Sequence, residues 1–346
     1  LFRSRGKAHI DLTTDACFLI GQAFGTILFE RTQKEHPIVI VGRDARTHGP
    51  ELEREVIEGL KHAGCSVRTI GAVPSPINYY MLCTTDADGG MQVTASHNPK
   101  EDNGIKLCTS GANAFAGEEL QMLYQRILKG GLRRADGGSE ETCDAVTPYT
   151  QHLTTFFAGC GNNLTVCIDA GNGIAGPVYS QILKAVGAKV IELYIEPDGT
   201  FPNHHPDPAH LENLQDLIRN LATTDNELGL AFDGDADRLG VVTKDGQVIF
   251  PDRQMMLFAK DVLTRHPKGQ IIYDVKCTRN LAPWIEQHGG QALMWKTGHS
   301  LVKAKLKETG APLAGEMSGH IFFKDRWFGF DDGLYTGARL LEILSK

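Results

Sequence analysis

The chain has 346 residues, of which 41% are hydrophobic and 22% charged, and its formal net charge is −7. These values are typical of a globular protein, and the length predicts two or three domains. No apolar run approaches the length of a membrane span, and the first residues show no signal-peptide pattern. The acidic balance gives no electrostatic basis for nucleic-acid binding.

The first predicted elements alternate between strands and helices. Continuous apolar runs bounded by turn residues indicate buried strands, and amphipathic runs that end at glycine indicate helices. In chain order these are a strand at 37–42, a helix at 51–64, strands at 66–70 and 90–94, and a helix at 118–128.

The same order of elements starts again twice. The second unit has strands at 164–169, 189–194 and 228–232 and a helix at 177–186, and the third has strands at 270–275 and 293–296 and a helix at 280–288. The glycine loop 171–176 resembles a dinucleotide fingerprint, but no acidic residue stands clearly at the ribose position, so a plain strand–helix turn is predicted.

Three such repeats predict an α/β fold of three similar domains with mixed, mostly parallel sheets. The predicted domains are residues 1–142, 143–246 and 247–346, with linkers near 130–147 and 243–247. The active site is expected in the cleft between domains.

A serine follows the predicted strand 90–94. The run 94–99 reads Thr-Ala-Ser-His-Asn-Pro. The Asn-Pro pair starts a turn, so the Ser96 hydroxyl would point outward beside His97, with Lys106 within reach. Alone, this run is more typical of an ordinary capped turn, and the later motifs favour a functional serine.

Three aspartates stand at alternate positions after the predicted strand 228–232. The run 233–238 reads Asp-Gly-Asp-Ala-Asp-Arg. Carboxylates this close repel one another unless a cation binds, and their hard oxygens favour Mg²⁺. An EF-hand is excluded because its glycine and glutamate positions hold Arg238 and Lys244. A solvated acidic turn is the remaining alternative.

The serine and the aspartates complement one another. A phosphate on Ser96 would add close to two negative charges and would fill positions that the three carboxylates leave open on Mg²⁺. Arg238 would be a further positive contact for that phosphate. The combination predicts a phosphoryl-transfer site, because this chemistry depends mainly on positioning and charge neutralisation.

A third motif lies at 315–320 and reads Gly-Glu-Met-Ser-Gly-His. In an extended segment Glu316, Ser318 and His320 would face the same side and would suit the vicinal hydroxyls of a sugar. A glycine-bounded surface loop is the alternative. Upstream candidates for phosphate or sugar contacts are Lys276, Gly298 and His299.

The three motifs, with the run 326–333 (Arg-Trp-Phe-Gly-Phe-Asp-Asp-Gly), resemble the α-D-phosphohexomutase superfamily. The likeness is greatest to its bacterial phosphomannomutase/phosphoglucomutase branch, and it covers nearly the whole chain. The resemblance implies reversible interconversion of hexose 1-phosphate and hexose 6-phosphate, with mannose or glucose as the sugar. It also implies a phosphoserine, a hexose 1,6-bisphosphate intermediate, Mg²⁺, and glucose 1,6-bisphosphate as activator.

The resemblance assigns expected roles to individual residues. Those implied to hold Mg²⁺ are the phosphoserine Ser96 and Asp233, Asp235 and Asp237. Those implied to surround the transferring group are His97, Lys106, Arg238 and His299, of which Lys106 and His299 are candidates for proton transfer. Implied substrate contacts are Arg5, Lys276, Gly298, Glu316, Ser318 and His320.

The sugar motif also separates the branches. Its Met317 is typical of the mannose/glucose mutases, whereas the glucosamine branch usually has glutamine there. Phosphoglucosamine mutase is the alternative within the class. A non-catalytic sugar-phosphate-binding protein is the alternative from another class.

Two features depart from the family pattern. Residues 2–6 read Phe-Arg-Ser-Arg-Gly, where the family has Tyr-Asp-Ile before Arg-Gly, and this affects the expected role of Arg5. The family's fourth domain, whose loop grips the second phosphate of the substrate, is expected to be absent from this chain, which stops at Lys346.

The eight cysteines have no metal-ligand spacing, and several lie in predicted strands. Free thiols in a reducing cytoplasm are therefore expected. The expected partners are small hexose phosphates, with no nucleic acid and no membrane, and the protein is expected to be a monomer or a weak dimer.

Overall fold

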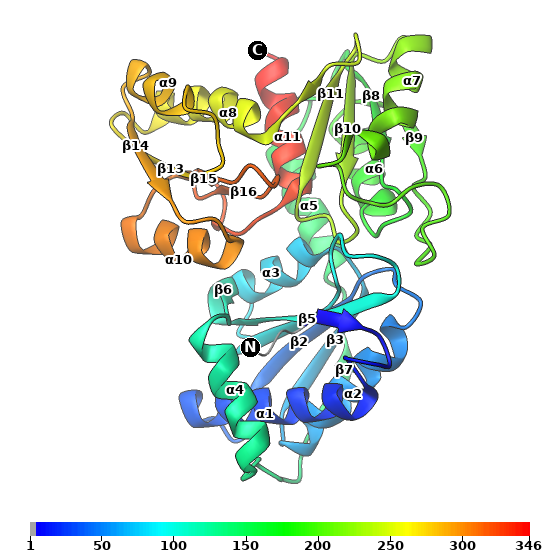
Figure 1. The fold of residues 1–346 in the computed structure, drawn as a ribbon, viewed down its shortest axis with the longest axis vertical. Helices are drawn as coiled ribbons and strands as arrows, with labels where there is room; N and C mark the ends of the chain where they lie inside the picture. Colours follow the sequence, from blue (N-terminus) through cyan, green and yellow to red (C-terminus); the bar gives the residue numbers. More distant parts are fainter. Residues whose placement is uncertain (1–4) are drawn as a thin grey trace. The chain divides into compact units, whose positions relative to one another are not determined.

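The computed structural model describes residues 5–346 and divides into two compact units (Figure 1). The first unit comprises Leu1–Pro148 and Asp198–Thr200, and the second comprises Tyr149–Pro197 and Phe201–Lys346. Across residues 5–346 no helix combines the length and the apolar character needed to cross a bilayer.

The described part of the first unit contains one mixed sheet of order β1-β5-β4-β2-β3-β7, with β6 paired to β5. Strand β2 is parallel to β3 and β4, and β3 is parallel to β7, whereas β5 is antiparallel to β1, β4 and β6. The strands are β1 (Arg5–Lys7), β2 (Ile38–Arg43), β3 (Ser66–Ala72), β4 (Gly89–Val93), β5 (Asp102–Thr109), β6 (Asn113–Ala114) and β7 (Ser139–Thr142).

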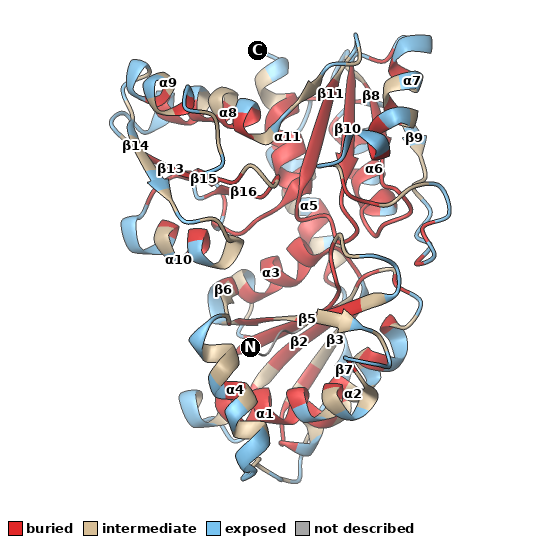
Figure 2. Cartoon of the chain, viewed as in Figure 1, coloured by how far each residue is buried: buried red, intermediate tan, exposed pale blue. Residues whose placement is uncertain are grey.

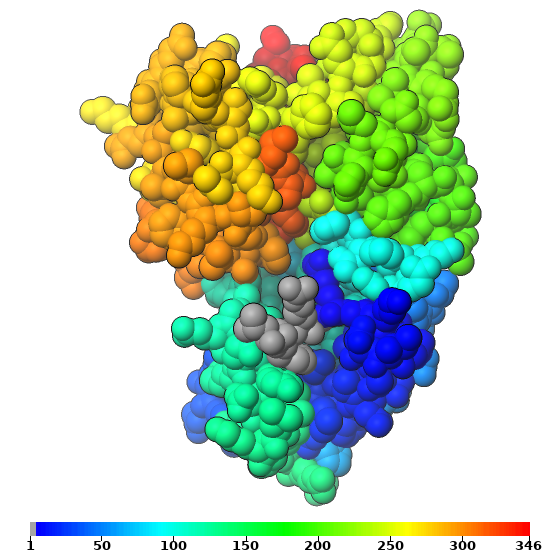
Figure 3. All heavy atoms as spheres, viewed as in Figure 1, coloured from blue at the N-terminus to red at the C-terminus, as the bar shows by residue number. Residues whose placement is uncertain are grey.

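Helices cover both faces of this sheet. Figure 1 shows α1, α2 and α4 on one face and α3 on the other, and Figure 3 shows α4, in teal, at the visible surface of this unit. The helices are α1 (Thr14–Thr32), α2 (Gly49–His62), α3 (Ser75–Thr84) and α4 (Glu118–Lys129), with a short 3₁₀ turn η1 (Ser110–Ala112).

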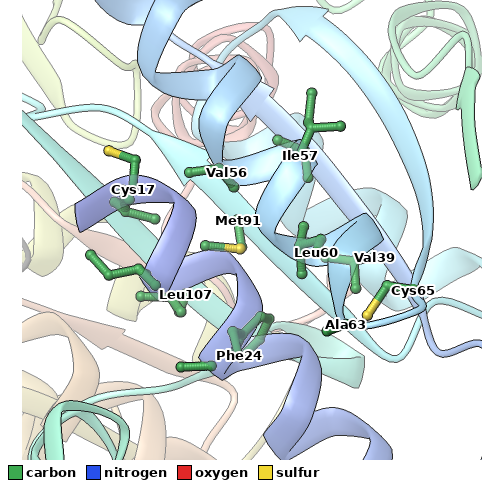
Figure 4. Packing of buried hydrophobic residues seen from close by; sticks show 14 of the residues in the cluster. Cys17, Phe24, Val39, Val56, Ile57, Leu60, Ala63, Cys65, Met91 and Leu107 are labelled. Carbon is green, nitrogen blue, oxygen red and sulfur yellow. The ribbon is translucent and has the colours of Figure 1, made fainter. Parts of the chain in front are cut away.

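The core of the first unit lies between the sheet and the pair α1 and α2 (Figure 4). Helix α2 directs Leu52, Val56 and Leu60 inward, at the spacing of one helix face, where all three are fully buried. Phe24 of α1 and Met91 of β4 lie in the same cluster. This packing fixes the end of β4, from which the serine loop leaves.

The second unit contains two sheets among its described residues. The first has the order β12-β11-β10-β8-β9, with β8 parallel to β9 and β10, and β11 antiparallel to β10 and β12. Its strands are β8 (Thr165–Asp169), β9 (Lys189–Leu193), β10 (Leu228–Phe232), β11 (Leu239–Thr243) and β12 (Val248–Ile249). The helical elements of this part are α5 (Val146–Phe156), α6 (Gly176–Ala185), η2 (Leu211–Leu214) and α7 (Gln215–Thr223).

The second sheet of this unit has the order β14-β13-β15-β16, with β13 parallel to β14 and β15, and β16 antiparallel to β15. Its strands are β13 (Gln270–Asp274), β14 (Gln291–Trp295), β15 (Leu313–Gly315) and β16 (Ile321–Phe323). The remaining helices are α8 (Pro251–Arg265), α9 (Leu281–Gln287), α10 (His299–Thr309) and α11 (Gly333–Leu344). Helix α11 contacts β11 of one sheet and β16 of the other, and so joins the two.

The predicted α/β class with mixed sheets is confirmed. Each of the three sheets has parallel strands with antiparallel strands toward one end. In Figure 2 the buried residues concentrate in strands such as β2 and β10, while α4 and α7 show exposed outer faces. The loops that carry the sequence motifs leave the ends of β4, β10 and β15. The predicted domain limits remain a prediction.

Candidate active site

Ser96 lies in the loop between β4 and β5. The N–H of Thr94 still donates to the carbonyl of Gly104 on β5, and the chain then turns away, with the N–H of Asn98 donating to the carbonyl of Ala95. Ser96 has a φ of 54°, in the left-handed region that few residues other than glycine adopt. Its Oγ lies 3.1 Å from Nδ1 of His97, so the structure brings this predicted pair together.

Two more predicted residues belong to the same unit. Arg5 lies on β1, opposite Gly104 of β5, and its Nη1 donates to Oδ1 of Asn98 at 3.4 Å, so Arg5 contacts the serine loop. Lys106 lies on β5, half-buried and opposite Gln92 of β4. Both therefore stand on strands that flank the loop.

The sequence reasoning missed the residues that hold the serine loop. Asp44, Arg46 and Thr94 are fully buried and hydrogen-bond to one another and to the peptide group of Ser96. Asp44 and Arg46 follow β2, the neighbour of β4 in the sheet. Polar residues directly after a buried parallel strand were the available signal.

The three predicted aspartates form a buried cluster after β10. Asp233, Asp235 and Asp237 are at most 1% exposed, and one carboxylate oxygen from each lies within 4.8 Å of the others. The loop is tight, with the N–H of Ala236 donating to the carbonyl of Asp233 and a φ of 65° at Ala236. Three buried carboxylates at this spacing suit a hard divalent cation, because oxygen ligands are what Mg²⁺ binds. The residues therefore fit the predicted metal.

Arg238 connects the acidic loop to the sugar motif. Its Nε donates to Oδ2 of Asp233 at 3.0 Å, and its Nη1 lies 3.3 Å from Oδ1 of Asp207 and donates to the carbonyl of Ser318 at 3.3 Å. Burial would lower the pKa of Arg238, but Asp233 and Asp207 outweigh it and raise the pKa. The Nη2 atom is buried and has no hydrogen-bond partner among the described residues, so it can donate to an anion.

The sugar motif is a hairpin turn, which corrects the expectation of an extended segment. Strands β15 and β16 flank it, the N–H of Glu316 donates to the carbonyl of His320, and the N–H of Gly319 donates to the carbonyl of Glu316. Gly319 has a φ of 105°, which requires glycine and turns the chain back. Alternation therefore does not align the three side chains, although Glu316 and His320 are cross-strand neighbours at the base of the turn.

Glu316 presents one carboxylate oxygen without a hydrogen-bond partner. The residue is 1% exposed, its Oε1 accepts from the N–H of Gly298 at 2.5 Å, and its Oε2 has no partner among the described residues. Burial raises the pKa of Glu316, while His320 and the Gly298 N–H oppose the shift. A buried acceptor of this kind suits a hydroxyl donor from a ligand.

Asp274, at the end of β13, accepts one hydrogen bond from the sugar motif and one from Thr297, the residue before Gly298. Its Oδ1 accepts from the N–H of Met317 at 3.1 Å, and its Oδ2 accepts from the hydroxyl of Thr297 at 2.7 Å. Lys276 is exposed in the turn that follows, and Gly298 stands directly before α10. The sequence reasoning did not assign a role to Asp274.

His320 and His299 share one carboxylate, that of Asp331. Nδ1 of His320 lies 3.0 Å from Oδ2 of Asp331 and 3.6 Å from Oδ1 of Asp237, while Nδ1 of His299 lies 3.7 Å from Oδ2 of Asp331. The two rings stack at 5.3 Å. Burial would lower the pKa of His320, but Asp237 and Asp331 outweigh it and raise the pKa.

Lys303 of α10 balances the charge of Asp331, with Nζ 2.8 Å from Oδ1. Burial would raise the pKa of Asp331, but Lys303 and His320 hold it well below its usual range. In the second unit the structure thus brings together the three aspartates, Arg238, Glu316, His320 and His299.

The fold and these groups are those of an α/β protein with a cluster of buried carboxylates that could hold a divalent cation, next to a hairpin turn that presents a buried carboxylate and an imidazole. Models of the three phosphoglucomutase/phosphomannomutase α/β/α domains match the chain: domain I at residues 4–134, domain II at 147–246 and domain III at 250–346. The chain belongs to this family, the bacterial phosphomannomutase/phosphoglucomutase branch of the α-D-phosphohexomutase superfamily.

Named relatives agree with this assignment. The chain is 50% identical over 343 residues to a phosphomannomutase/phosphoglucomutase of Pseudomonas aeruginosa, covering 99% of the chain and 73% of that protein. It is 50% identical over 342 residues to a phosphoglucomutase of Neisseria gonorrhoeae, with the same coverage. A crystal structure of a phosphoglucomutase/phosphomannomutase family protein from Burkholderia thailandensis has a TM-score of 0.94 and 52% identity, covering 99% of this chain and 75% of that one.

Proposed function

We propose that the protein interconverts hexose 1-phosphates and hexose 6-phosphates of mannose and glucose, and that Ser96 carries the transferred phosphoryl group. The observation that carries the proposal is the position of Arg238. Its guanidinium joins the buried acidic loop, through Asp233, to the sugar motif, through the carbonyl of Ser318, and keeps Nη2 available for an anion. Membership of the family supports the same reaction.

In the proposed reaction the Oγ–P bond of phosphorylated Ser96 breaks and a bond forms between phosphorus and a sugar hydroxyl oxygen. The proton of that hydroxyl goes to Lys106 or to His299, and the released Oγ of Ser96 takes up a proton. The Ser96 hydroxyl then attacks the other phosphorus of the hexose 1,6-bisphosphate, the bond between that phosphorus and its sugar oxygen breaks, and the sugar oxygen takes up a proton as Ser96 gives up its own. This second transfer restores the phosphoserine. Glucose 1,6-bisphosphate therefore serves as the activator of an unphosphorylated chain.

Mg²⁺ is the proposed metal, held by Asp233, Asp235, Asp237 and the phosphate on Ser96; when bound, it neutralises negative charge on the transferring group. Arg238 adds a fixed positive charge next to these carboxylates, and His97 places its Nδ1 3.1 Å from Oγ of Ser96. The three buried aspartates offer negatively charged oxygen ligands, and this supports Mg²⁺ as the metal.

Glu316 is the proposed acceptor for sugar hydroxyls, through its unpartnered Oε2. The remaining proposed substrate contacts are Arg5, Lys276, Gly298, Ser318 and His320. Gly298 has a φ of 131°, a conformation that side chains rarely allow, and its N–H holds Oε1 of Glu316. Gly298 thus holds Glu316 with its Oε2 available to the substrate.

Phosphopeptide mapping by mass spectrometry tests the role of Ser96. We expect one phosphate on Ser96 after incubation of the protein with glucose 1,6-bisphosphate and Mg²⁺. Ser96→Ala is expected to remove both labelling and turnover. Ser110→Ala, an exposed serine of the same unit, is the control and is expected to keep both. Turnover by Ser96→Ala would overturn the proposal.

Comparison of sugars tests the specificity. Values of kcat/KM for mannose, glucose and glucosamine 1-phosphates are expected to rank the amino sugar last. A preference for the amino sugar would favour a phosphoglucosamine mutase. Tight binding of all three without turnover would favour a non-catalytic sugar-phosphate-binding protein.

We further propose that the protein works in the cytoplasm as a monomer or a weak dimer on small-molecule substrates. Six cysteines are free thiols, which supports a reducing compartment: Cys17, Cys65, Cys143, Cys160, Cys167 and Cys277. Light scattering after size-exclusion chromatography, over a range of protein concentrations, measures the oligomeric state. A stable larger oligomer would contradict this part of the proposal.

A further inference from the structure

All five N–H donors of the Arg46 guanidinium point to acceptors in and around the serine loop. The side chain is fully buried, and its Nε donates to Oδ2 of Asp44 at 3.2 Å. The other four donors end on backbone carbonyls: Nη1 on Pro99 (2.6 Å) and Asp102 (2.8 Å), and Nη2 on Ser96 (3.0 Å) and Asn98 (2.7 Å). A guanidinium has five donors in a fixed plane, and here every one is used.

Both sides of Ser96 belong to one closed ring of hydrogen bonds. The N–H of Ser96 donates to Oγ1 of Thr94 at 2.8 Å, and the Thr94 hydroxyl donates to Oδ2 of Asp44 at 2.6 Å. Asp44 accepts from Nε of Arg46, whose Nη2 donates to the carbonyl of Ser96. The ring therefore fixes the N–H and the C=O of the residue whose side chain is proposed to react.

The conformation of Ser96 needs such support. A left-handed φ costs an L-residue roughly 1–2 kcal/mol, so it persists only where the surroundings enforce it. The charge pair alone does not explain the arrangement, because a lysine would also pair with Asp44. Only the planar fork of arginine reaches four carbonyls of one loop at once.

We propose that Arg46 is a positioning residue for the phosphoryl-carrying serine, acting with Asp44 and Thr94 as a clamp on the main chain of Ser96. The clamp rests on the proposed function in that Ser96 must carry the phosphoryl group. It holds Oγ in one direction during transfer, and a displacement of about 1 Å at a reacting atom costs on the order of 100-fold in rate. Neither Arg46 nor Thr94 needs to touch the substrate.

The first test is Arg46→Lys, which keeps the charge beside Asp44 and loses the fork. We expect kcat to fall on the order of 100-fold while KM changes less than about threefold. Phosphorylation of Ser96 by glucose 1,6-bisphosphate is expected to slow by a similar factor. Arg54→Lys, an exposed arginine of α2 in the same unit, is the matched control and is expected to leave both quantities unchanged.

Thr94 provides the second test, because Arg46→Lys can lower stability. Thr94→Val removes the hydroxyl in the ring, and Thr94→Ser retains it. We expect Thr94→Val to slow phosphorylation of Ser96 at least about tenfold and Thr94→Ser to recover most of that loss. If Arg46 and the Thr94 hydroxyl had a purely structural role, Arg46→Lys and Thr94→Val would each lower the thermal midpoint. The kcat of the folded variants would then be unchanged.

The outcomes separate the clamp from the proposed function. If wild-type Ser96 is never phosphorylated, the proposed function fails and the clamp with it. If wild-type Ser96 is phosphorylated and folded Arg46→Lys and Thr94→Val match it in rate, the proposed function stands and the clamp is overturned.

Discussion

Nε of Arg238 donates to Oδ2 of Asp233 across 3.0 Å, so an arginine pairs with one carboxylate of the acidic loop. Asp207 shares the same guanidinium at 3.3 Å. The arginine and a bound cation therefore act on the same group of negative charges. Removal of the arginine therefore changes how much a bound cation stabilises the folded protein.

Arg238→Met is expected to increase the stabilisation that Mg²⁺ gives. Without the guanidinium the buried carboxylates repel one another more strongly, so a cation relieves more energy, about 1 kcal/mol or more, or roughly 2–4 °C in the thermal midpoint. The measurement is the shift in midpoint on addition of Mg²⁺, compared with wild type. Arg219→Met, an exposed arginine of α7, is the control. An equal shift in Arg238→Met and wild type would show that the arginine does not share the charge.

Chelation is expected to destabilise the wild type and to have little effect on Asp235→Asn. The three carboxylates lie together only in the folded chain, so a cation that binds there would stabilise that state by mass action. The measurement is the thermal midpoint in EDTA and in Mg²⁺. Asp225→Asn, at an exposed position of the same unit, should behave as wild type. A wild type that does not respond to chelation would contradict a divalent site.

The sequence predicted the elements whose pattern is local. The predicted strand at 228–232 coincides with β10, and the acidic loop follows it as expected, because a continuous apolar run that ends in charge marks a strand end. Helix α1 was not predicted. Its residues from Ile20 to Leu28 are all buried, so it lacks the polar face that gives a helix its period in the sequence.

Candidate site residues could be predicted where several reactive or charged residues are adjacent in the sequence. They could not be predicted where they depend on contacts between residues far apart in the sequence. The serine and the aspartates stand out as motifs. Arg46 does not, because four of its five acceptors lie 50 to 56 positions further along the chain and are backbone carbonyls, which every residue has. The sugar-binding role of residues 315–320 remains a prediction. The turn at Gly319 follows from the pairing of β15 with β16, which alternation along one strand does not reveal.

Glu316→Gln is expected to raise KM for glucose 1-phosphate about tenfold or more. The amide oxygen can still accept from the N–H of Gly298, but the charged acceptor is lost, and hydrogen bonds to charged groups contribute about 1.5–3 kcal/mol. The measurement is steady-state kinetics with a thermal-midpoint check on folding. Glu308→Gln, exposed on α10, is the control. An unchanged KM in folded Glu316→Gln would remove Glu316 from the substrate contacts.

Asp332 is expected to make stability fall as pH rises. Burial raises its pKa to about 7, against hydrogen bonds from the N–H of Tyr335 and the hydroxyl of Tyr149. Between the unfolded value, 3.8, and about 7 the folded state holds more protons, so this residue removes about 1.4 kcal/mol of unfolding free energy per pH unit.

Asp332→Asn isolates that effect. The stability of the variant relative to wild type is expected to increase as pH rises from 4 to 7, measured by denaturant unfolding at each pH. Asp225→Asn should show no such trend. Parallel curves for Asp332→Asn and wild type would mean that Asp332 is ionised throughout.

Gly337→Ala is expected to destabilise the second unit by about 1–3 kcal/mol, because a Cβ there would overlap the hydroxyl oxygen of Tyr179 on α6. The same hydroxyl is buried and has no hydrogen-bond partner among the described residues, so Tyr179→Phe alone should be close to neutral or stabilising. In the Tyr179→Phe background Gly337→Ala should lose most of its cost, since only the ring carbon, 2.9 Å from the new Cβ, remains to adjust. A double-mutant cycle from denaturant unfolding measures this coupling, expected at about 1–2 kcal/mol. Additive effects of the two substitutions would show that α11 shifts away from Tyr179, so that the new Cβ does not contact its hydroxyl.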